Sequence, residues 1–580
     1  MNFLKGLAII SLLLLTQACK TGSRVASVPA GKTADKKPMD DKQVSIQYNY
    51  YNAVKEKLLG NSDKAIVLFS QVLRDEPNNH AAMYELASIY IEKNKINDAL
   101  HFSKSAAALN PENDWYLLQL AEIYSKTNQT KEAVEIYEKL SKRHPERPDY
   151  LFQWADALLY SGKPMEAIKV YDKLENSIGK SKELTVQKER IYLRLGKTDL
   201  AAAEIEKYIK ENPTDEDGYT LLIDMYLANN MGEKALEVVE RLKAFDPKNP
   251  RISLSMAEYY RLKGEKEKSF NELKKAFASP QLNSDIMLQI LTSYFPLVKD
   301  NPDMLTQALE LCKLMSEAHP GEASAHAVHG DFLTFAKDYN EARGEYREAL
   351  AIDGRNMPAW TQLMSIEAEL RDYVSMEKEA DAALELYPDQ SVFYLFSGVA
   401  KSQNNKPEAA IKVLMSGSKL VVDNDVQLIQ FYSNLGDIYN KQKEYTSSDN
   451  YFDKALKINA NDVTILNNYA YYLSVRNAQL EKAEVMSKKS NELSPNQPSY
   501  EDTYAWILYK QGNYQSAKVW IEKAIANGAE GNGTILEHCG DINYKLGQTE
   551  EALKYWQKAK STGDYSELLD KKIADRKLYE

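Results

Sequence analysis

Side chains that could do chemistry are few in this sequence of 580 residues, and most of them stand alone. Histidine occurs seven times, and its one cluster is His319, His326 and His329, with Asp331 close by. His326 and His329 are three positions apart, so they would share one face of a helix, as a pair of metal ligands does. We expect instead that one of them packs at an interface and the other is solvated, with no metal bound.

No other pattern in the sequence indicates catalysis. There is no glycine-rich phosphate loop, no nucleophile elbow, no zinc-spaced set of Cys and His, and no His-Glu-x-x-His signature. Acidic residues are abundant but spread along polar faces, so no isolated acid–base pair stands out. Cys312 and Cys539 lie in distant segments, and we expect both to be small buried apolar residues without a disulfide. The sequence therefore predicts no enzyme activity, no catalytic residues and no cofactor.

The third cysteine, Cys19, follows a segment with the features of a signal peptide. A lysine precedes an apolar run from Leu7 to Leu15, and Ala18 stands directly before the cysteine. The run is too short to span a bilayer, which needs about 20 apolar residues. Residues 1–18 resemble a bacterial lipoprotein signal, although Thr16 stands where an aliphatic residue is usual. The resemblance implies cleavage before Cys19 and lipidation of its side chain; an ordinary secreted protein and an uncleaved anchor are the alternatives.

The residues after Cys19 favour one location. Lys20 follows, so the aspartate that marks inner-membrane retention in many lipoproteins is missing, and no acidic run comes next. The resemblance therefore implies an outer-membrane lipoprotein that faces the periplasm of a bacterial cell envelope. Residues 19–45 have no aromatic side chain and contain several Gly and Pro, so we expect a disordered tether.

Size and charge limit what the rest of the chain can be. A chain of 580 residues is too long for one globular core, whereas a repeat array has no such limit because each unit contacts only its neighbours. The formal net charge is −11, so the chain as a whole repels phosphate backbones. We therefore expect no nucleic acid among the partners.

Two sets of residues recur every 34 positions in one register, and such a period predicts stacked copies of one supersecondary unit. The first set has small side chains: Ala65, Ala99, Ala133, Ala167, Ala201, Ala235 and Ser269. The second set stands five residues earlier and contains only Gly and Asn: Gly60, Asn94, Asn128, Gly162, Gly196, Asn230 and Gly264.

One copy of the unit, residues 80–113, reads as two antiparallel helices. Its first half has apolar residues at helical spacing, and a break at Asn94 turns the chain, because Asn tolerates the left-handed conformation that ends a helix. The second half contains Ala99 and stops at Asn110-Pro111. Small residues such as Ala99 are expected where the two helices cross.

The repeat pattern resembles the tetratricopeptide repeat. Its residues in the third copy are Trp115, Leu118, Ala121, Tyr124, Asn128, Ala133, Tyr137 and Pro145, and in the fourteenth Trp506, Leu508, Gly512, Tyr514, Ala517 and Ala524. The resemblance implies an all-α fold: a right-handed α-solenoid of about fifteen antiparallel helix pairs. Tetratricopeptide lipoproteins of the periplasm and outer membrane of Gram-negative bacteria are similar in plan.

The register breaks between Ser269 and Ala308, where the step is 39 residues instead of 34. Several prolines lie between them, so we expect a seam near 280–303 that separates two lobes. The sequence thus predicts an N-terminal array over 46–283 and a C-terminal array over 284–566. Residues 567–580 are expected to form a capping helix with a polar outer face.

In this family the first helix of each unit lines a concave groove, and the resemblance implies which positions face it. Asparagines at the sixth position would clamp a peptide backbone, since an amide both donates and accepts, and aromatic side chains would add contact area. The partner-binding residues expected toward the carboxyl end are Asn434, Asp437, Asn467, Asn468, Tyr471, Asp502 and Trp506. Those expected toward the amino end are Tyr84, Trp115 and Phe152.

The sequence therefore predicts a membrane-tethered scaffold or adaptor that holds other proteins or extended peptides in its groove. Docking of a protease to its substrates, envelope assembly and secretion are processes in which similar lipoproteins act. The alternative is a binder of glycan or cell-wall fragments that uses the aromatic side chains of the groove.

Overall fold

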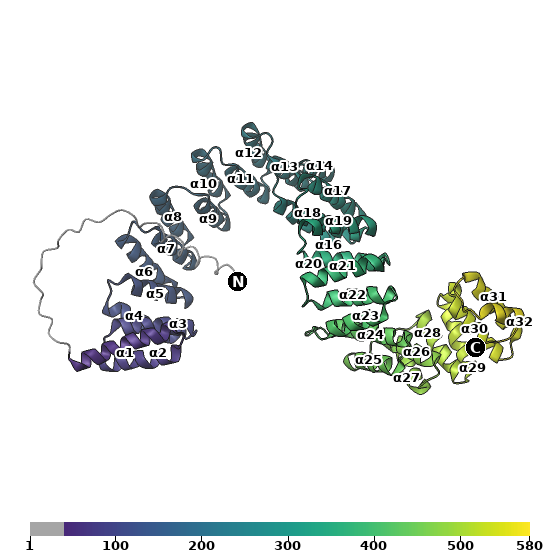
Figure 1. Ribbon diagram of the computed structural model, residues 1–580. Coiled ribbons are helices and arrows are strands. Elements are labelled where there is room, and N and C mark those ends of the chain that lie inside the picture. Colours follow the sequence, from purple (N-terminus) through teal and green to yellow (C-terminus); the bar gives the residue numbers. More distant parts are fainter. Residues whose placement is uncertain (1–39) are drawn as a thin grey trace, which may run out of the picture. The chain divides into compact units, whose positions relative to one another are not determined.

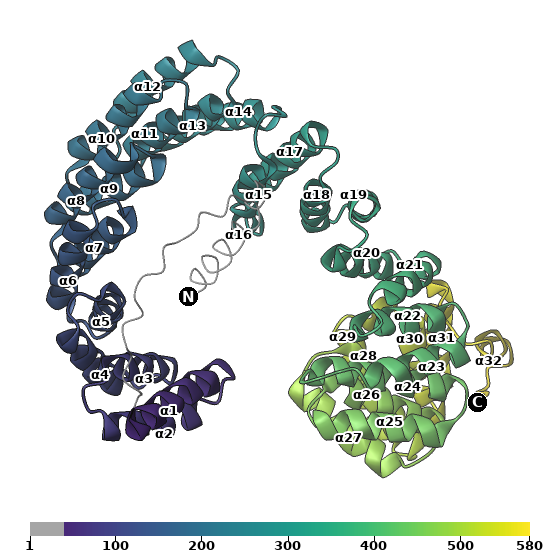
Figure 2. The same cartoon turned by 60° about the vertical axis from the view of Figure 1, so that its left-hand side comes forward.

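The computed structural model describes residues 40–580, and the regular elements in that range are all helices. The helices pair into antiparallel hairpins, and within each compact unit of the chain each hairpin stacks on the next (Figures 1 and 2), which is the predicted α-solenoid. The predicted signal segment, Cys19 and most of the predicted tether lie outside the described residues. Of the helices described, none combines the length and the apolar character needed to cross a bilayer.

The chain forms two compact units, one ending at Gly218 and one spanning Tyr219–Glu580. The boundary falls inside α11 (Glu216–Ala228). The helices before it are α1 (Asp41–Leu58), α2 (Ser62–Asp75), α3 (His80–Glu92), α4 (Ile96–Leu109), α5 (Asp114–Lys126), α6 (Thr130–Arg143), α7 (Pro148–Tyr160), α8 (Pro164–Ile178), α9 (Lys182–Arg194) and α10 (Thr198–Glu211).

The helices after the boundary follow the same hairpin plan. They are α12 (Gly232–Phe245), α13 (Pro250–Leu262), α14 (Lys266–Phe277), α15 (Ser284–Thr292), α16 (Phe295–Val298), α17 (Pro302–Ala318), α18 (Ala323–Phe335), α19 (Tyr339–Ile352), α20 (Met357–Glu369), α21 (Tyr373–Leu386), α22 (Ser391–Gln403), α23 (Pro407–Ser418), α24 (Asp425–Lys441), α25 (Tyr445–Ile458), α26 (Val463–Val475), α27 (Leu480–Leu493), α28 (Pro498–Lys510), α29 (Tyr514–Ala526), the 3-10 turn η2 (Ala529–Gly531), α30 (Gly533–Lys545), α31 (Thr549–Thr562) and α32 (Leu569–Asp575).

Every turn inside a regular hairpin depends on one residue in the left-handed conformation. The seven Gly and Asn residues of the second comb all have positive φ, such as Asn94 at 56° and Gly162 at 73°. The amide of the next residue then reaches back to close the helix end: Lys95 N–H donates to the carbonyl of Tyr90 at 2.8 Å. Spacing and residue type together therefore predicted these turns correctly.

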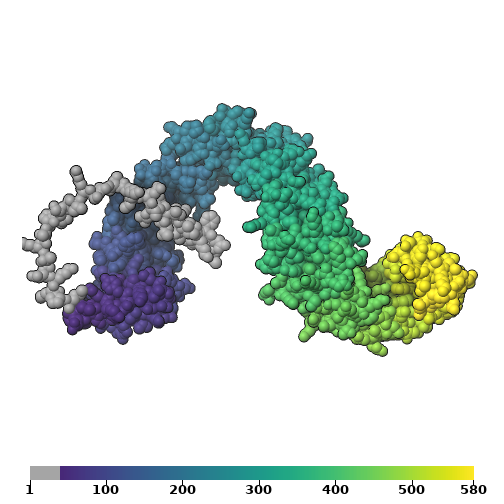
Figure 3. All heavy atoms as spheres, viewed as in Figure 1, coloured from purple at the N-terminus to yellow at the C-terminus, as the bar shows by residue number. Residues whose placement is uncertain are grey.

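The helix crossings inside the hairpins are closed by small residues. The alanines of the first comb are buried, and most have no exposed surface at all. Four positions after alanines of this set stand large buried side chains such as Phe69 and Tyr171, and Tyr346 stands in the same way after Ala342. In three hairpins such a ring lies so close to a glycine of the first helix that a Cβ there would come within 3.0 Å of it: Gly330 with Tyr346, Gly436 with Phe452, and Gly540 with Trp556. Hairpins built this way abut without a break in the surface of each unit (Figure 3).

One hairpin is irregular, and it lies where the sequence register breaks. In place of a single first helix of 13 residues it has two short ones, α15 and α16, followed by the long helix α17. Pro296 is in the first turn of α16, where its fixed φ is tolerated. The predicted lobe boundary at residues 283 and 284 falls inside the second compact unit, at the start of α15, and remains a prediction.

Both ends of the array carry extra helical structure. The first helix begins at Asp41, inside the predicted tether, because Asp40 caps it by accepting a hydrogen bond from the amide of Lys42. At the other end, α32 lies within the segment 567–580 where the sequence predicts a capping helix. Its Lys572 is buried and donates hydrogen bonds to Glu537 at 2.8 Å and Asp541 at 2.7 Å, so an ion-pair cluster fixes α32 to α30.

A buried pair of acids lies in the middle of the second unit. Glu367 on α20 has no exposed surface, and one nitrogen of Arg347 lies 2.8 Å from a carboxylate oxygen of both Glu367 and Glu379. Burial and the neighbouring Glu379 raise the pKa of Glu367 to about 8, although Arg347 opposes this shift. Near neutral pH, a proton on Glu367 therefore stabilises this hairpin.

This raised pKa predicts a pH dependence of stability. The folded chain holds a proton that the unfolded chain releases near pH 4.5, so the contribution of Glu367 is complete below about pH 4.5 and is lost as the pH rises through about 8. Glu367→Gln, which has no proton to lose, should flatten the fall of the free energy of unfolding in that window. Guanidinium unfolding followed by circular dichroism between about pH 5 and 9 measures this. Glu369→Gln, at an exposed position of the same helix, is the control and should keep the wild-type slope. Equal slopes for wild type and Glu367→Gln would contradict the assignment.

Candidate functional site

A pocket in the second unit brings together four of the predicted partner-binding residues: Asn467, Asn468, Tyr471 and Asp502. They come from the first helices of successive hairpins, because each hairpin places the same positions on the same face. Asn467, Asn468 and Tyr471 lie on α26 and Asp502 on α28, while Thr534 and Ile535 at the start of α30 close the far side. The pocket has a volume of about 280 Å³.

The amide groups of this pocket are only partly satisfied. The side chain of Asn467 donates a long hydrogen bond, 3.4 Å, to the side-chain carbonyl of Asn468. Asn467 itself is buried, and among the described residues its own carbonyl oxygen finds no hydrogen-bond donor. A buried acceptor without a partner is costly, and because this oxygen is itself buried it lies in the wall of the pocket, out of reach of an occupant.

Beside this pocket lies a group of stacked rings joined to an ion pair: Trp506, Tyr509, His538 and Asp502. The ring of His538 stacks on Trp506 with centroids 3.9 Å apart, and Trp506 also stacks on Tyr509. His538 Nδ1 lies 2.8 Å from a carboxylate oxygen of Asp502. Burial lowers the pKa of His538, but Asp502, aided by nearby acids, outweighs burial and holds it above the ordinary value. The contact with Asp502 therefore favours the protonated form of His538 and ties α30 to α28.

The other residues predicted near the carboxyl end lie outside this pocket. Asn434 on α24 donates its side-chain N–H to the carbonyl of Gln430 in its own helix. Asp437 accepts a hydrogen bond of 3.0 Å from the hydroxyl of Tyr472, which links α24 to α26. Trp506 is only 8% exposed, because its two stacking partners cover its faces. None of these three side chains lines the pocket.

The first unit has a wider hollow, about 560 Å³ in volume, along its own first helices. Tyr84 on α3 and Trp115 on α5 both line it, and the ring of Trp115 is 65% exposed. Phe152 on α7 is not among its lining residues; its ring contacts Tyr171 edge-on at 6.2 Å. Two of the three predicted residues near the amino end therefore share one hollow, and the third lies apart.

Sequence reasoning missed several members of the second-unit pocket. Ser499, Asn532 and Thr534 line it, yet none was singled out. Thr503 and His538 occupy the same sixth position as Asn468 in the next two hairpins, so reading that position through to α30 would have found them. Asn532 lies in the turn before α30 and gave no periodic signal.

The last residues of the chain reach the same row of first helices. The hydroxyl of Tyr509 on α28 donates to the carboxylate of Glu580, and the ammonium of Lys545 on α30 lies 3.3 Å from it. Burial raises the pKa of the Tyr509 hydroxyl, and Glu580 raises it further. This contact occupies the carboxyl-terminal ends of α28 and α30, whereas the 280 Å³ pocket lies at their amino-terminal ends.

The histidine and cysteine candidates have defined surroundings. Nδ1 of His326 lies 2.7 Å, and Nδ1 of His329 3.0 Å, from the two oxygens of one carboxylate, that of Glu345. Burial opposes ionisation of Glu345, yet hydrogen bonds from His329 and His326 hold its pKa below the ordinary value. Cys312 and Cys539 are free and buried, and burial raises the pKa of both thiols, so neither is reactive.

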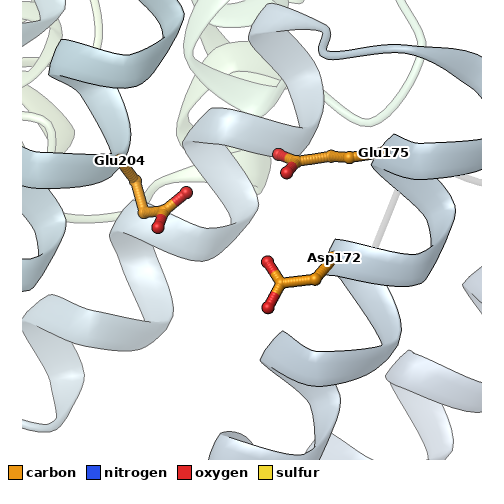
Figure 4. Close-up of side chains that lie close together, drawn as sticks. All are labelled: Asp172, Glu175 and Glu204. Carbon is orange, nitrogen blue, oxygen red and sulfur yellow. The ribbon is translucent and has the colours of Figure 1, made fainter.

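Three carboxylates converge in the first unit as metal ligands do. Asp172 and Glu175 extend from α8 toward Glu204 on α10 (Figure 4). A cation is already present between them, since the buried ammonium of Lys188 lies 2.7 Å from Asp172, 3.0 Å from Glu175 and 2.6 Å from Glu204. Burial lowers the pKa of Lys188, but these hydrogen bonds outweigh it and raise the pKa. The cluster is a structural ion-pair network across α8, α9 and α10.

Hairpins stacked in this way, with grooves along their first helices, define an α-solenoid of the kind typical of scaffolds for protein–protein interaction. Models of the family described as tetratricopeptide repeat match residues 58–102, 95–151, 192–259 and 429–462. The chain contains tetratricopeptide repeats in these segments, as the spacing of its small residues and turn residues predicts.

Individual proteins resemble the chain only distantly. A tetratricopeptide-repeat-containing protein of Pseudomonas aeruginosa is 23% identical over 203 residues, which is 35% of this chain and 34% of the relative, so the chain spans about a third of that protein's length. Among solved structures, yeast Tom70 is 16% identical, with 85% of this chain and 93% of that chain covered and a TM-score of 0.31. A tetratricopeptide repeat protein from Parabacteroides merdae is 21% identical, with coverages of 40% and 92% and a TM-score of 0.27.

The Lys188 network predicts a large effect of a single substitution. Lys188→Met would leave the buried Glu175 without its cation and would leave Glu204 only its exposed partner Lys207, so the free energy of unfolding should fall by about 3–5 kcal/mol. Lys207→Met is the matched control: Lys207 also pairs with Glu204, but its side chain is 56% exposed, and the loss should stay below about 1 kcal/mol. Guanidinium unfolding of the full chain compares the two. Equal losses would show that burial of the network is not what stabilises this part of the chain.

Proposed function

We propose that this protein is a membrane-tethered scaffold that holds partner proteins or extended peptides in the grooves of its first helices. The observation that carries the proposal is the convergence of Asn467, Asn468, Tyr471 and Asp502 on one pocket. The pocket offers amide donors and acceptors, a carboxylate and an aromatic ring, which suit a peptide backbone with a side-chain anchor. The process served is protease docking, envelope assembly or secretion.

The pocket recognises a partner in two ways. The amide of Asn468 both donates and accepts, so it reads a partner's backbone without regard to side chains. The rim formed by Tyr471 and Tyr472 supplies flat apolar area at little entropic cost. Because Asp502 is held by His538, its carboxylate stays fixed in place and can accept a hydrogen bond from a donating group on the partner.

Removal of a single amide tests the groove. Asn468→Ala should weaken binding of a partner protein about tenfold and leave the unfolding transition unchanged, since the lost group faces the pocket and not the core. Asn450→Ala, at an exposed position of the second helix α25, is the control and should bind as wild type does. A photocrosslinking residue placed at Thr534 or at exposed Lys488, followed by mass spectrometry of whole cells, supplies the partner. Crosslinked protein should come from Thr534 alone.

Other outcomes of that experiment would refute the proposal. If crosslinks from Thr534 yield glycan or cell-wall fragments and no protein, the groove belongs to a carbohydrate binder. If Asn468→Ala unfolds the carboxyl-terminal hairpins, the side chain is structural and the assignment to the groove fails.

The tether is the second part of the proposal. Lipid on Cys19 would hold the scaffold at the outer membrane, facing the periplasm, and would raise the local concentration of any captured partner. Cys19→Ser should move the protein from the membrane pellet to the soluble fraction of lysed cells. Lys20→Ser, which keeps the cysteine, is the control and should remain in the pellet. A Cys19→Ser variant that stays with membranes would mean that the anchor is elsewhere.

A further inference from the structure

The irregular hairpin opens a second, larger hollow, which lies entirely inside the unit Tyr219–Glu580. Here α14 packs on α17, and the short helices α15 and α16 do not fill the space that a regular first helix would take. The result is a pocket of about 700 Å³ between α11, α13 and α14 on one side and α15, α16 and α17 on the other. Its size lies within the range of sites that bury most of a ligand.

The inner wall of this hollow is mainly apolar. The apolar side chains come from both sides of the register break: Leu254, Phe270, Leu273, Ile290, Leu297 and Met304. Leu297, on the short helix α16, is 50% exposed. The wall therefore presents aliphatic and aromatic surface that the chain itself leaves uncovered.

The charged residues at this hollow fall into two kinds. Arg261 and Glu258 neutralise each other through two hydrogen bonds of 2.6 Å. Asp224 and Arg251 differ: among the described residues, neither side chain has a hydrogen bond or ion-pair partner, although both line the hollow and attract each other electrostatically. Reduced hydration raises the pKa of Asp224 above its ordinary value. The carboxylate of Asp224, an acceptor, and the guanidinium of Arg251, a donor, thus both line the hollow without a hydrogen-bond partner in the part of the chain that the structure describes.

These charged positions continue the pattern of the groove. Arg251, Leu254 and Glu258 occupy on α13 the second, fifth and ninth positions of the repeat, and Asp224 occupies the ninth position on α11. A chain that runs along the first helices would therefore pass Asp224 and Arg251 and meet the apolar wall directly beyond them. A lipid tail would satisfy the apolar wall but would leave this open acceptor and donor unmatched.

We propose that this hollow binds a short peptide segment, whose bulky apolar side chains enter between α13 and α15 while a backbone amide lies between Asp224 and Arg251. The inference rests on the proposed scaffold function and adds a second site with a stated preference, for leucine and phenylalanine side chains. The amide N–H donates to Asp224 and the amide carbonyl accepts from Arg251, so both open groups gain partners. The site is independent of the pocket around Asn468.

The test uses the full chain and two fluorescein-labelled peptides, Gly-Ser-Leu-Phe-Leu-Ser-Gly and the same peptide with three alanines in place of Leu-Phe-Leu. Ser293 is exposed and lines the hollow, so Ser293→Trp places an indole ring in part of it without touching the core. Thr292→Trp adds the same ring at the adjacent exposed position, which does not line the hollow. Fluorescence anisotropy should show binding of the Leu-Phe-Leu peptide to wild type and Thr292→Trp, and a loss of at least about tenfold in Ser293→Trp. Arg251→Gln should weaken binding a few-fold.

Three results would overturn the proposal. The first is equal binding of the two peptides to wild type, and the second is equal binding of the Leu-Phe-Leu peptide to the two tryptophan variants. The third is binding of a fluorescent fatty acid, lost in Ser293→Trp, where the peptide does not bind at all. Asn468→Ala is measured in parallel: loss of peptide binding there but not in Ser293→Trp would refute this site and leave the scaffold function standing.

Discussion

The stack depends on one steric constraint, the close approach of two helices at the centre of each hairpin. An alanine-sized residue on the second helix permits the approach, and a large side chain four positions later fills the space that opens beside it. Where the ring is largest, the first helix has to supply a glycine, as Gly540 does opposite Trp556. Each crossing sets the angle between a hairpin and the next one. The positions of the first helices, and of the pockets along them, therefore follow from these contacts.

Much of this architecture was predictable, because the constraint repeats at a fixed period. For the turns, the position within the repeat was a better predictor of the left-handed conformation than the residue type. In the second unit the left-handed turn position is held by Lys337, Arg371 and Lys443, which a search for Gly or Asn does not find. A left-handed residue with a side chain costs about 1–2 kcal/mol, so the flanking helices impose that conformation on these residues. The site was predictable for the same reason: periodic positions on neighbouring first helices had to meet.

What the sequence did not reveal arises from contacts that break the period. Trp506 has the position of a groove residue, but His538 of the next hairpin covers its face, and such stacking depends on the identity of a residue far along the chain. The acidic cluster around Lys188 reads as ordinary surface charge until three helices bring it together. The hollow beside α15 exists because the register break leaves space unfilled. No residue type or spacing in the sequence indicates such an unfilled space.

The ammonium of Lys572 has a consequence for anything that runs along the first helices. Glu537 and Asp541 occupy on α30 the positions that Asn467 and Tyr471 occupy on α26, yet both carboxylates are already paired with α32. On α30, these two positions are therefore already engaged in an ion-pair cluster within the protein. A partner that binds along the first helices therefore cannot use these two carboxylates, and the contacts open to it end before them.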